Sequence, residues 1–304
     1  MEVLSQIHEN NFSAYNADCV EVVASLPSNS VDFTIFSPPF SSLYTYSNSE
    51  RDMGNSKNDE EFFMHFDFLV EHLFRLTKPG RIVAFHCMNI PAMKERDGYI
   101  GIKDFRGDLI RCFQKQGFIY HSEHCIWKDP LIEATRTKAI GLMHKQLCKD
   151  STICRSGLPD YLIAMRKPGE NQDMVSHADG LDKFYGENPP TSGTLSHERW
   201  RRYASPVWMD IRQTYTLQVS TAREQDDERH ICPLQLDVIE RGLQLWSRKN
   251  DVVLSPFMGI GSEGYVAIKD DRRFIGIELK TAYFNVAVDN LRKAENEKNE
   301  LTLF

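Results

Sequence analysis

The sequence predicts an α/β fold built on a doubly wound, mostly parallel sheet, and three observations lead to this prediction. Short apolar runs alternate with amphipathic helical patterns over residues 15–128. The same alternation returns after residue 228. A strand in that part is followed at once by a glycine-rich turn and a helix, as in nucleotide-binding sheets. The 304 residues allow one large domain or two modest ones.

The first half of the chain contains three predicted strands and two predicted helices. The apolar runs at 31–37, 81–87 and 118–127 are typical of buried strands. Residues 59–80 have apolar side chains at three- and four-residue steps and predict a helix, with Lys-Pro-Gly marking its end. Residues 104–117 predict a second helix that stops at a glycine. Strands therefore alternate with helices, as parallel sheets require.

The periodic pattern is lost between residues 168 and 228. This stretch is polar, rich in Gly, Pro and Asn, and so long an irregular segment is usually functional. We therefore divide the chain into one half of a core (1–167), an inserted target-recognition region (168–228) and the second half of the same core (229–304). The elements expected in the last part are a helix at 233–249, strands at 251–255 and 273–279, a helix at 262–270 and a final helix from 281.

Composition limits the class of protein. Hydrophobic content of 41% and charged content of 26% are those of an ordinary soluble globular protein, without a membrane-length apolar run or a signal peptide, so we expect a cytoplasmic location. Seven scattered cysteines without a CxxC pair predict reduced thiols and no metal site. The net charge of -7 argues against a wholly basic nucleic-acid coat but allows a local basic face.

The first strand ends on Ser37-Pro38-Pro39-Phe40. Two prolines stiffen a loop and cannot donate N–H bonds that would compete for its carbonyl groups. Alone, this run is equally typical of a turn that simply ends a strand. Its place at the carboxyl end of a predicted parallel strand is where such sheets bind ligands.

The second informative stretch is the glycine-rich turn, residues 255–261, with the sequence SPFMGIG. Its glycines let the backbone approach a ligand, and Glu278 lies at the tip of the next strand, about 20 residues on, where nucleotide-type folds bind ribose. This spacing favours a nucleoside-bearing cofactor over a plain strand–helix connection. The third glycine of the dinucleotide fingerprint and a phosphate-binding Lys-Ser/Thr are both missing, which argues against NAD and ATP.

Together, SPPF at 37–40 and SPFMGIGSEG with IGIEL at 255–279 resemble the motifs of DNA amino-methyltransferases, which methylate the exocyclic nitrogen of cytosine or adenine. The catalytic motif precedes the cofactor motif, as in the beta class of that family. The resemblance covers nearly the whole chain outside 168–228. It implies S-adenosylmethionine as cofactor, S-adenosylhomocysteine as product, double-stranded DNA as substrate, and a base flipped out of the duplex.

The resemblance also assigns residues to roles. Ser37 Oγ and the Pro38 carbonyl would accept hydrogen bonds from the target amine, and Phe40 would stack on the base. The catalytic residues are then Ser37, Pro38, Pro39 and Phe40. The cofactor-binding residues are Asp18, Cys19, His230, Pro233, Gln235, Ser255, Pro256, Phe257, Gly259, Gly261, Ser262 and Glu278. Many relatives have Asp where this chain has Ser255, so one carboxylate near the methionine end of the cofactor is missing.

DNA contacts are expected from two segments that mix cations with aromatic or apolar residues, 135–150 and 198–208. The alternative is a structural lid with surface arginines. The residues expected to contact DNA are Arg136, Lys138, Lys145, Arg201, Arg202 and Arg212.

Several functions stay open at this point. Serine at the head of the catalytic motif favours cytosine N4 over adenine N6 as the target. A catalytically inactive DNA-binding relative is an alternative because of Ser255. Methylation of RNA or of protein glutamine is disfavoured by the motif order and by the long insert. A homodimer and a cognate restriction endonuclease are further partners that the resemblance allows.

Overall fold

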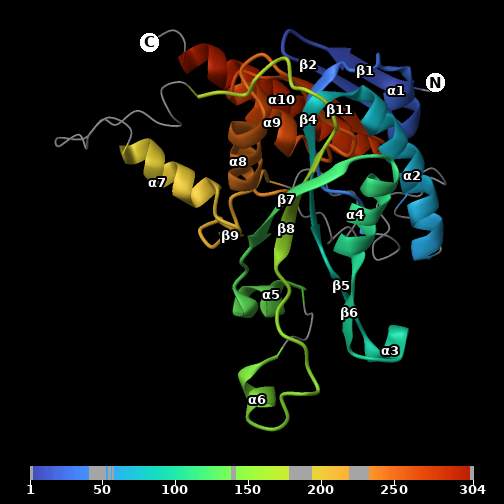
Figure 1. Cartoon of the computed structure of the whole chain (residues 1–304), viewed down its shortest axis with the longest axis vertical. Helices are drawn as coiled ribbons and strands as arrows, with labels where there is room; N and C mark the ends of the chain where they lie inside the picture. The colour runs from blue at the N-terminus through green and yellow to red at the C-terminus, as the bar shows by residue number, and fades with distance from the viewer. Residues whose placement is uncertain are drawn as a thin grey trace.

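A computed structural model describes residues 3–40, 53, 56, 58–137, 142–177, 194–218 and 233–301. Its main feature is a nine-stranded sheet in the order β1-β2-β11-β10-β3-β4-β8-β7-β9, with a separate β5–β6 hairpin (Figure 1). Five of the eight strand pairings in the large sheet are parallel, so the predicted fold class is confirmed. The strands are β1 (Val3–His8), β2 (Phe12–Ala17), β3 (Val31–Phe36), β4 (Thr77–Met88), β5 (Ile90–Ala92), β6 (Gly101–Lys103), β7 (Ile119–Ile126), β8 (Asp160–Arg166), β9 (Val207–Trp208), β10 (Val252–Ser255) and β11 (Arg273–Glu278).

Helices cover both faces of this sheet. The apolar residues of α1, α2 and α4 pack in one cluster on one face, and those of α8, α9 and α10 pack in a second cluster on the other. Within the described ranges, no helix is long and apolar enough to cross a membrane. The helices are α1 (Cys19–Ser25), α2 (Asp59–Leu76), α3 (Lys94–Asp97), α4 (Phe105–Lys115), α5 (Pro130–Thr137), α6 (His144–Leu147), α7 (Thr194–Tyr203), α8 (Leu236–Trp246), α9 (Ser262–Lys269) and α10 (Thr281–Leu301).

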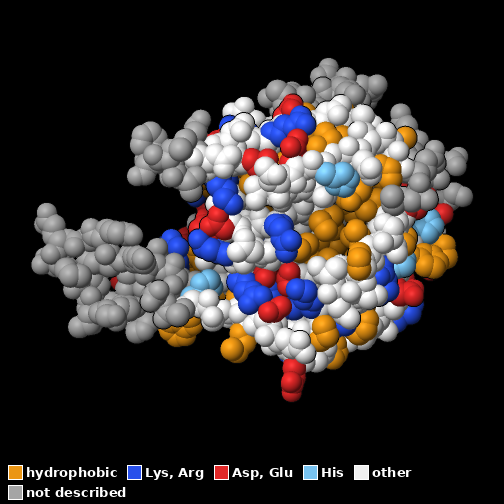
Figure 2. All heavy atoms as spheres, turned by 90° about the horizontal axis from the view of Figure 1, so that it is seen from above, with side chains coloured by type: hydrophobic (Ala, Val, Ile, Leu, Met, Phe, Trp, Pro, Cys, Tyr) orange, Lys and Arg blue, Asp and Glu red, His pale blue; other side chains and the backbone are white. Residues whose placement is uncertain are grey.

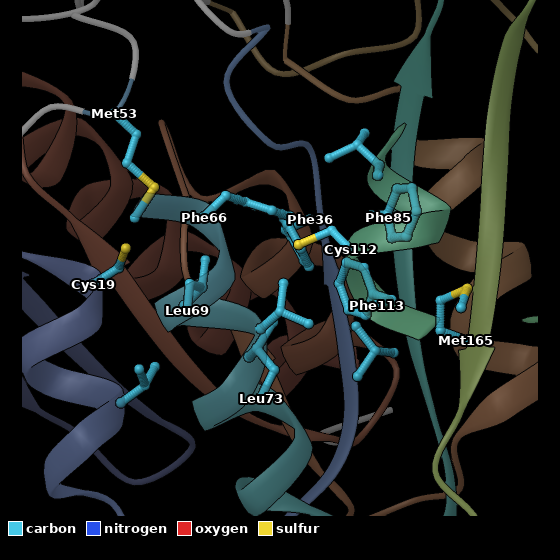
Figure 3. Packing of buried hydrophobic residues seen from close by; sticks show 14 of the residues in the cluster. Cys19, Phe36, Met53, Phe66, Leu69, Leu73, Phe85, Cys112, Phe113 and Met165 are labelled. Carbon is cyan, nitrogen blue, oxygen red and sulfur yellow. The ribbon is translucent and has the colours of Figure 1, made fainter. Parts of the chain in front are cut away.

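Helix α2 shows how the sequence produces the first face. Asn58 caps it by accepting a hydrogen bond from the Glu61 N–H at 2.8 Å. Its buried side chains recur at helical spacing, and Figure 3 shows Phe66 and Leu73 in one cluster with Phe36 of β3. The three- and four-residue steps in the sequence are thus the stripe by which α2 packs on the sheet.

The predicted Lys-Pro-Gly stop belongs to the following strand. Helix α2 ends at Leu76, and Lys78, Pro79 and Gly80 already lie in β4. The β3–β4 register shifts there, from Val31 opposite Thr77 to Phe33 opposite Ile82. Gly80 has a φ of 75°, so the three residues form an irregular start to the strand instead of a loop.

Buried ion pairs join the amino ends of the central strands. Arg81 at the start of β4 is 2% exposed and pairs with Asp251 just before β10, and its Nε donates to the Asp32 carbonyl at 2.8 Å. Lys78 reaches the Asp32 carboxylate at 2.7 Å. Seen from above, the molecule carries Lys, Arg, Asp and Glu side chains intermixed (Figure 2). This face is thus not a uniformly basic surface.

Two projections extend beyond the sheet, side by side at the bottom of Figure 1. The first, here called the β5–β6 arm (residues 89–104), follows β4. The second, the α5–α6 arm (residues 127–159), connects β7 to β8. Because β4 and β7 both run toward these arms, the arms lie at the edge where the parallel strands have their carboxyl ends.

Within 168–228, the described residues 168–177 and 194–218 contain more regular structure than the sequence suggests. They include α7 and β9, and Trp208 and Ile211 are buried in the second core cluster. Trp208 is 1% exposed and stacks on His124 at 4.3 Å between ring centroids, so it supports the core. Two parts of the segment that we expected to be irregular, α7 and β9, are therefore regular, and Trp208 in β9 anchors them next to β7.

Close helix–sheet packing depends on Gly264 in α9. A Cβ there would lie 2.5 Å from the ring of Phe274 and would also meet Leu291. We expect Gly264→Ala to lower the free energy of unfolding by about 1–3 kcal/mol, because the packed core cannot absorb the extra methyl group. Urea unfolding measures this loss. Gly157→Ala is the control, because its Cβ would meet Pro130 at an ordinary 3.6 Å, and an equal loss in both variants would contradict the explanation.

Candidate active site

The central cavity lies where the strand order reverses. Strand β3 leads outward to β4, whereas its parallel neighbour β10 leads to β11 on the other side. Open parallel sheets bind ligands at such a point. A pocket with an empty volume of about 1130 Å³, open mouth included, lies beyond these strand ends. Ser37 and Pro256, which follow the paired strands β3 and β10, both line it. The two sequence motifs therefore meet in one cavity.

The proline loop forms one wall of this pocket. Ser37 through Phe40 all line it, and Pro38 is buried while the other three are half-buried. The Phe40 ring packs against Phe105 at 6.1 Å between centroids, tilted by 46°. Phe105 opens α4 directly after the β5–β6 arm. The first core cluster thus supports the loop through Phe40.

The glycine turn forms the opposite wall. Gly259 and Gly261 have φ values of 51° and 86°, a left-handed conformation that side chains other than glycine rarely adopt. A Cβ on Gly259 would meet nothing within 4 Å, which leaves open space beside the backbone for a ligand. The N–H of Met258 donates to the Ile277 carbonyl at 2.9 Å and holds the turn against β11.

Glu278 is placed as the sequence predicts, at the tip of β11 and on the pocket wall. One carboxylate oxygen accepts the Gly259 N–H and the other accepts the Lys280 N–H, each at 2.9 Å. A carboxylate oxygen can accept more than one hydrogen bond, so a ribose hydroxyl could also donate to Glu278. Glu278 therefore fixes the glycine turn and also offers an acceptor to the pocket.

Asp18 and Cys19 line the adjoining wall. Asp18 caps α1, because its Oδ1 accepts the Val20 N–H at 2.8 Å. Burial raises the pKa of the Cys19 thiol well above its usual range, and the charge of Asp18 adds to this. The thiol therefore stays protonated and is a poor nucleophile.

Glu263 is a pocket residue that our sequence analysis missed. It lies in the first turn of α9, is 4% exposed and lines the cavity. Burial raises the pKa of its carboxyl to about 8, and the nearby charge of Glu278 acts in the same direction. Among the described residues, no ion pair joins Glu263 to a Lys or Arg. The sequence held one signal for Glu263, because Glu263-Gly264 stands where the dinucleotide fingerprint has its third glycine.

The remaining predicted cofactor residues divide into two groups. Pro233, Pro256, Phe257 and Ser262 line the pocket. Ser255, Gln235 and Gly261 do not, and His230 lies outside the described residues. Ser255 is fully buried and its Oγ has no hydrogen-bond partner, so it lies behind the lining residue Pro256. The departure from Asp therefore leaves a small buried hydroxyl under the turn.

Two more residues beside the proline loop escaped our sequence analysis. Ser37 Oγ lies 3.2 Å from Nδ1 of His86, near the end of β4. His86 Nε2 lies 3.3 Å from Oδ2 of Asp160, the first residue of β8. Both are buried polar groups. A histidine close to the end of an otherwise apolar strand was the only sequence signal for His86.

The residues expected to contact DNA are spread over two places. Lys145 is exposed on α6 in the α5–α6 arm. Arg201 and Arg202 on α7 line a surface hollow together with Asp210. Arg212 forms a two-pronged ion pair with Asp237, the shortest contact being 2.6 Å, so its charge is already offset. The Arg136 side chain and Lys138 lie outside the described residues.

The cysteines and histidines at 121–125 have ordinary structural roles. His124 packs on Trp208, and the Nδ1 of His124 lies 2.9 Å from the Ser205 carbonyl. In the part of the chain that the structure describes, no group of three or more His, Cys, Asp or Glu is arranged to hold a metal ion.

The sheet is doubly wound, and at its switch point a nucleoside-type turn lies beside a proline loop. This combination defines a Rossmann-like transferase of the methylase type. The family model described as DNA methylase matches residues 31–289, and the chain belongs to this family of N6 and N4 amino-methyltransferases. The catalytic motif precedes the cofactor motif, as in the beta class. The protein is accordingly a DNA methyltransferase, as the resemblance predicted.

Individual relatives agree with this assignment. Type II methyltransferase M.BglII of Bacillus subtilis is 24% identical over 290 residues, which cover 94% of this chain and 70% of that protein. Orphan methyltransferase M.BamHII of Bacillus amyloliquefaciens is 23% identical, covering 86% and 89%.

Solved structures share the fold. A candidate DNA modification methylase of Thermus thermophilus aligns with a TM-score of 0.61 at 21% identity, covering 91% of this chain and 93% of that one. The cytosine-N4-specific PvuII DNA methyltransferase aligns with a TM-score of 0.55 at 16% identity, covering 95% and 92%.

Proposed function

We propose that the protein transfers a methyl group from S-adenosylmethionine to the exocyclic amine of a base flipped out of double-stranded DNA, with cytosine N4 as the preferred target. One observation supports this most strongly: Ser37-Pro38-Pro39-Phe40 and the turn at 256–260 line the same pocket. When bound, the cofactor supplies an electrophilic methyl group. Its product is S-adenosylhomocysteine, and the reaction needs no metal.

The residues present fit this cofactor. The left-handed Gly259 leaves open space beside the backbone, and the Glu278 carboxylate at the pocket wall can accept hydrogen bonds from ribose hydroxyls. Asp18 and Cys19 bound the end of the cavity where the adenine ring would lie. Pro233, Pro256, Phe257 and Ser262 add lining surface. The wall is mostly apolar with a few polar groups, as in most ligand-binding pockets.

The proline loop supplies the chemistry on the substrate side. An exocyclic amine is a weak nucleophile because its lone pair is delocalised into the ring. Ser37 Oγ and the Pro38 carbonyl accept hydrogen bonds from its N–H groups and thereby localise the lone pair, while the half-buried Phe40 ring offers a stacking face. Since the pocket lies inside the cleft, the base must leave the duplex to reach it.

Ser255 leaves the cofactor turn without the usual acid, and Glu263 is a further acidic residue in the cavity, besides Asp18 and Glu278. We assign to Glu263 the role of facing the cationic part of the cofactor. Isothermal calorimetry with S-adenosylmethionine tests this. Affinity should fall in Glu263→Gln, whereas affinity for 5′-methylthioadenosine, which lacks the amino acid and the positive charge, should be unchanged. An equal loss for both ligands would contradict this assignment.

The preference for cytosine rests on Ser37 at the head of the catalytic motif. Incubation of the protein with labelled S-adenosylmethionine and duplexes that contain only G·C or only A·T pairs, followed by digestion to nucleosides, identifies the product. N4-methylcytosine is the expected result. N6-methyladenine as the only product would make adenine the target.

The alternative of a DNA-binding protein without catalytic activity is suggested by Ser255. Calorimetry distinguishes the two functions, because this alternative predicts no binding of S-adenosylmethionine with or without DNA. Methylation mapping of host DNA with and without the expressed gene gives target base and site together. The homodimer and the cognate restriction endonuclease stay predictions, and this mapping does not test them.

Basic residues in two parts of the molecule are proposed to bind the DNA backbone. Lys145 is exposed on the α5–α6 arm, and Arg201 and Arg202 lie on α7. We expect Lys145→Gln and Arg201→Gln each to weaken binding of duplex DNA regardless of sequence, and to reduce the slope of log K against log salt by about 1. Arg136, Lys138 and Arg212 stay predicted DNA contacts, although Asp237 already offsets the charge of Arg212.

Fluorescence anisotropy over a range of salt concentrations measures these slopes. Lys293→Gln on α10 is the matched control, because Lys293 is equally exposed but lies in another part of the fold. Its slope should equal that of the wild type. Slopes that are unchanged in the Lys145 and Arg201 variants would remove these residues from the DNA interface.

A further inference from the structure

A chain of three polar side chains leads from the pocket into the sheet. Ser37, His86 and Asp160 come from the neighbouring strands β3, β4 and β8. The distances are 3.2 Å from Ser37 Oγ to His86 Nδ1 and 3.3 Å from His86 Nε2 to Asp160 Oδ2. Adjacent strands fix this spacing, since His86 lies opposite Leu162 in the antiparallel β4–β8 pair. The three groups are therefore held in line by the sheet itself.

The far end of this chain is a buried carboxylate with a cation behind it. Asp160 is 5% exposed, and Lys128 Nζ contacts its Oδ1 at 2.8 Å. Burial alone would raise the pKa of Asp160, but the charge of Lys128 and the contact with His86 outweigh it and lower this pKa. Lys128 also contacts Glu133 at 3.3 Å. Asp160 is thus ionised and offers its second oxygen to His86.

The arrangement also determines which nitrogen of His86 carries the proton. Nε2 is buried, and its contact with Asp160 is too long or too bent to be a complete hydrogen bond. A carboxylate can only accept, so it favours the tautomer with the proton on Nε2. Nδ1 then has a free lone pair facing Ser37, and it can accept only the hydroxyl proton of that residue.

We propose that His86, oriented by Asp160 and Lys128, is a positioning residue that holds the Ser37 hydroxyl so that its oxygen accepts an N–H of the target amine. This proposal rests on the proposed function. A serine hydroxyl whose proton has no acceptor can either donate a hydrogen bond to a neighbouring group or accept one from it. With the O–H directed to His86 Nδ1, the Ser37 lone pairs face the pocket.

The same contacts give a path for the proton that the reaction releases. The amine nitrogen forms a bond to the methyl carbon, and the bond between that carbon and sulfur breaks with its electron pair left on sulfur. The nitrogen then carries one proton too many. That proton passes to Ser37 Oγ while the Ser37 hydroxyl proton passes to His86 Nδ1, and Asp160 stabilises the imidazolium so formed.

A double-mutant cycle tests the proposal. We expect His86→Ala to lower kcat by about 10²-fold, within the range of positioned acid–base groups. In the Ser37→Ala background, the same change should have almost no effect, because His86 acts through Ser37. Single-turnover methyl transfer measures both, and calorimetry should show S-adenosylmethionine affinity within about twofold of wild type.

Two further variants keep the cycle interpretable. His124→Ala is the matched control, because His124 is buried to a similar extent in the same sheet but contacts Ser205 and Trp208. Its kcat should equal that of the wild type. Asp160→Asn keeps the shape of the side chain. It should lower kcat when it is introduced into the wild type, but not when it is introduced into the His86→Ala variant.

The outcomes separate this proposal from the proposed function. Two results would overturn the role of His86 and leave the methyltransferase assignment standing, provided that the wild type is active. In the first, His86→Ala keeps the full kcat. In the second, His86→Ala lowers kcat by the same factor in the wild type and in the Ser37→Ala variant. Partial recovery of His86→Ala by added imidazole, absent in Ser37→Ala/His86→Ala, supports the role of His86. A folded wild type without activity on any DNA overturns both.

Discussion

Replacing Ser37 by alanine is expected to reduce kcat by about 10²–10³-fold while the fold and cofactor affinity stay intact. Ser37 lines the pocket and its Oγ contacts only His86 among the hydrogen bonds described, so the loss of this atom removes one proposed acceptor for the amine and disturbs little packing. Single-turnover transfer from labelled S-adenosylmethionine measures the rate. Calorimetry and thermal unfolding of the same variant provide the controls for binding and folding.

Ser28→Ala is a useful companion variant for Ser37→Ala. Ser28 is a serine before β3 that contacts Arg75 at 3.2 Å, and it is not among the pocket residues. Its turnover should match that of the wild type. If Ser37→Ala also turned over at the wild-type rate, Ser37 would have no part in methyl transfer, and the Pro38 carbonyl would have to be the acceptor.

Replacing Glu263 by glutamine is expected to stabilise the free protein at pH 7 by about 3 kcal/mol. Burial raises the pKa of this carboxyl from 4.5 to about 8 in the folded state. Between these values the unfolded chain loses the proton and the folded chain keeps it, so folding is progressively disfavoured as pH rises. Glutamine has a similar shape and cannot ionise, so it removes this cost.

The pH dependence distinguishes this effect from a change in packing. Wild type and Glu263→Gln should differ little at pH 4, where both states carry the proton, and the difference should grow up to about pH 8 and then level off. Urea unfolding at a series of pH values measures it. The control Glu71→Gln, on the exposed side of α2, should stay within about 0.5 kcal/mol of wild type. A destabilised Glu263→Gln variant at pH 7 would contradict the explanation.

Much of the fold could be predicted because its signals are local. The stripe of apolar residues in α2 and the mostly apolar runs in β3 and β10 predicted elements whose starts agree closely with the structure, although α2 ends at Leu76 and not at Gly80. The glycine turn was also readable, because left-handed φ values at Gly259 and Gly261 demand glycine. In contrast, β9 has two residues and no periodicity, and only its pairing with β7 makes it a strand.

The sequence by itself determined the two motifs, their order and the class of chemistry they serve, since each motif is a continuous stretch whose residue types are set by local backbone geometry. Only the tertiary structure decided what surrounds them. Ser37, His86 and Asp160 lie far apart along the chain and meet because β3, β4 and β8 are neighbours in the sheet. Burial, which gives Glu263 its raised pKa, likewise depends on the whole fold, because it requires side chains from several elements to exclude water.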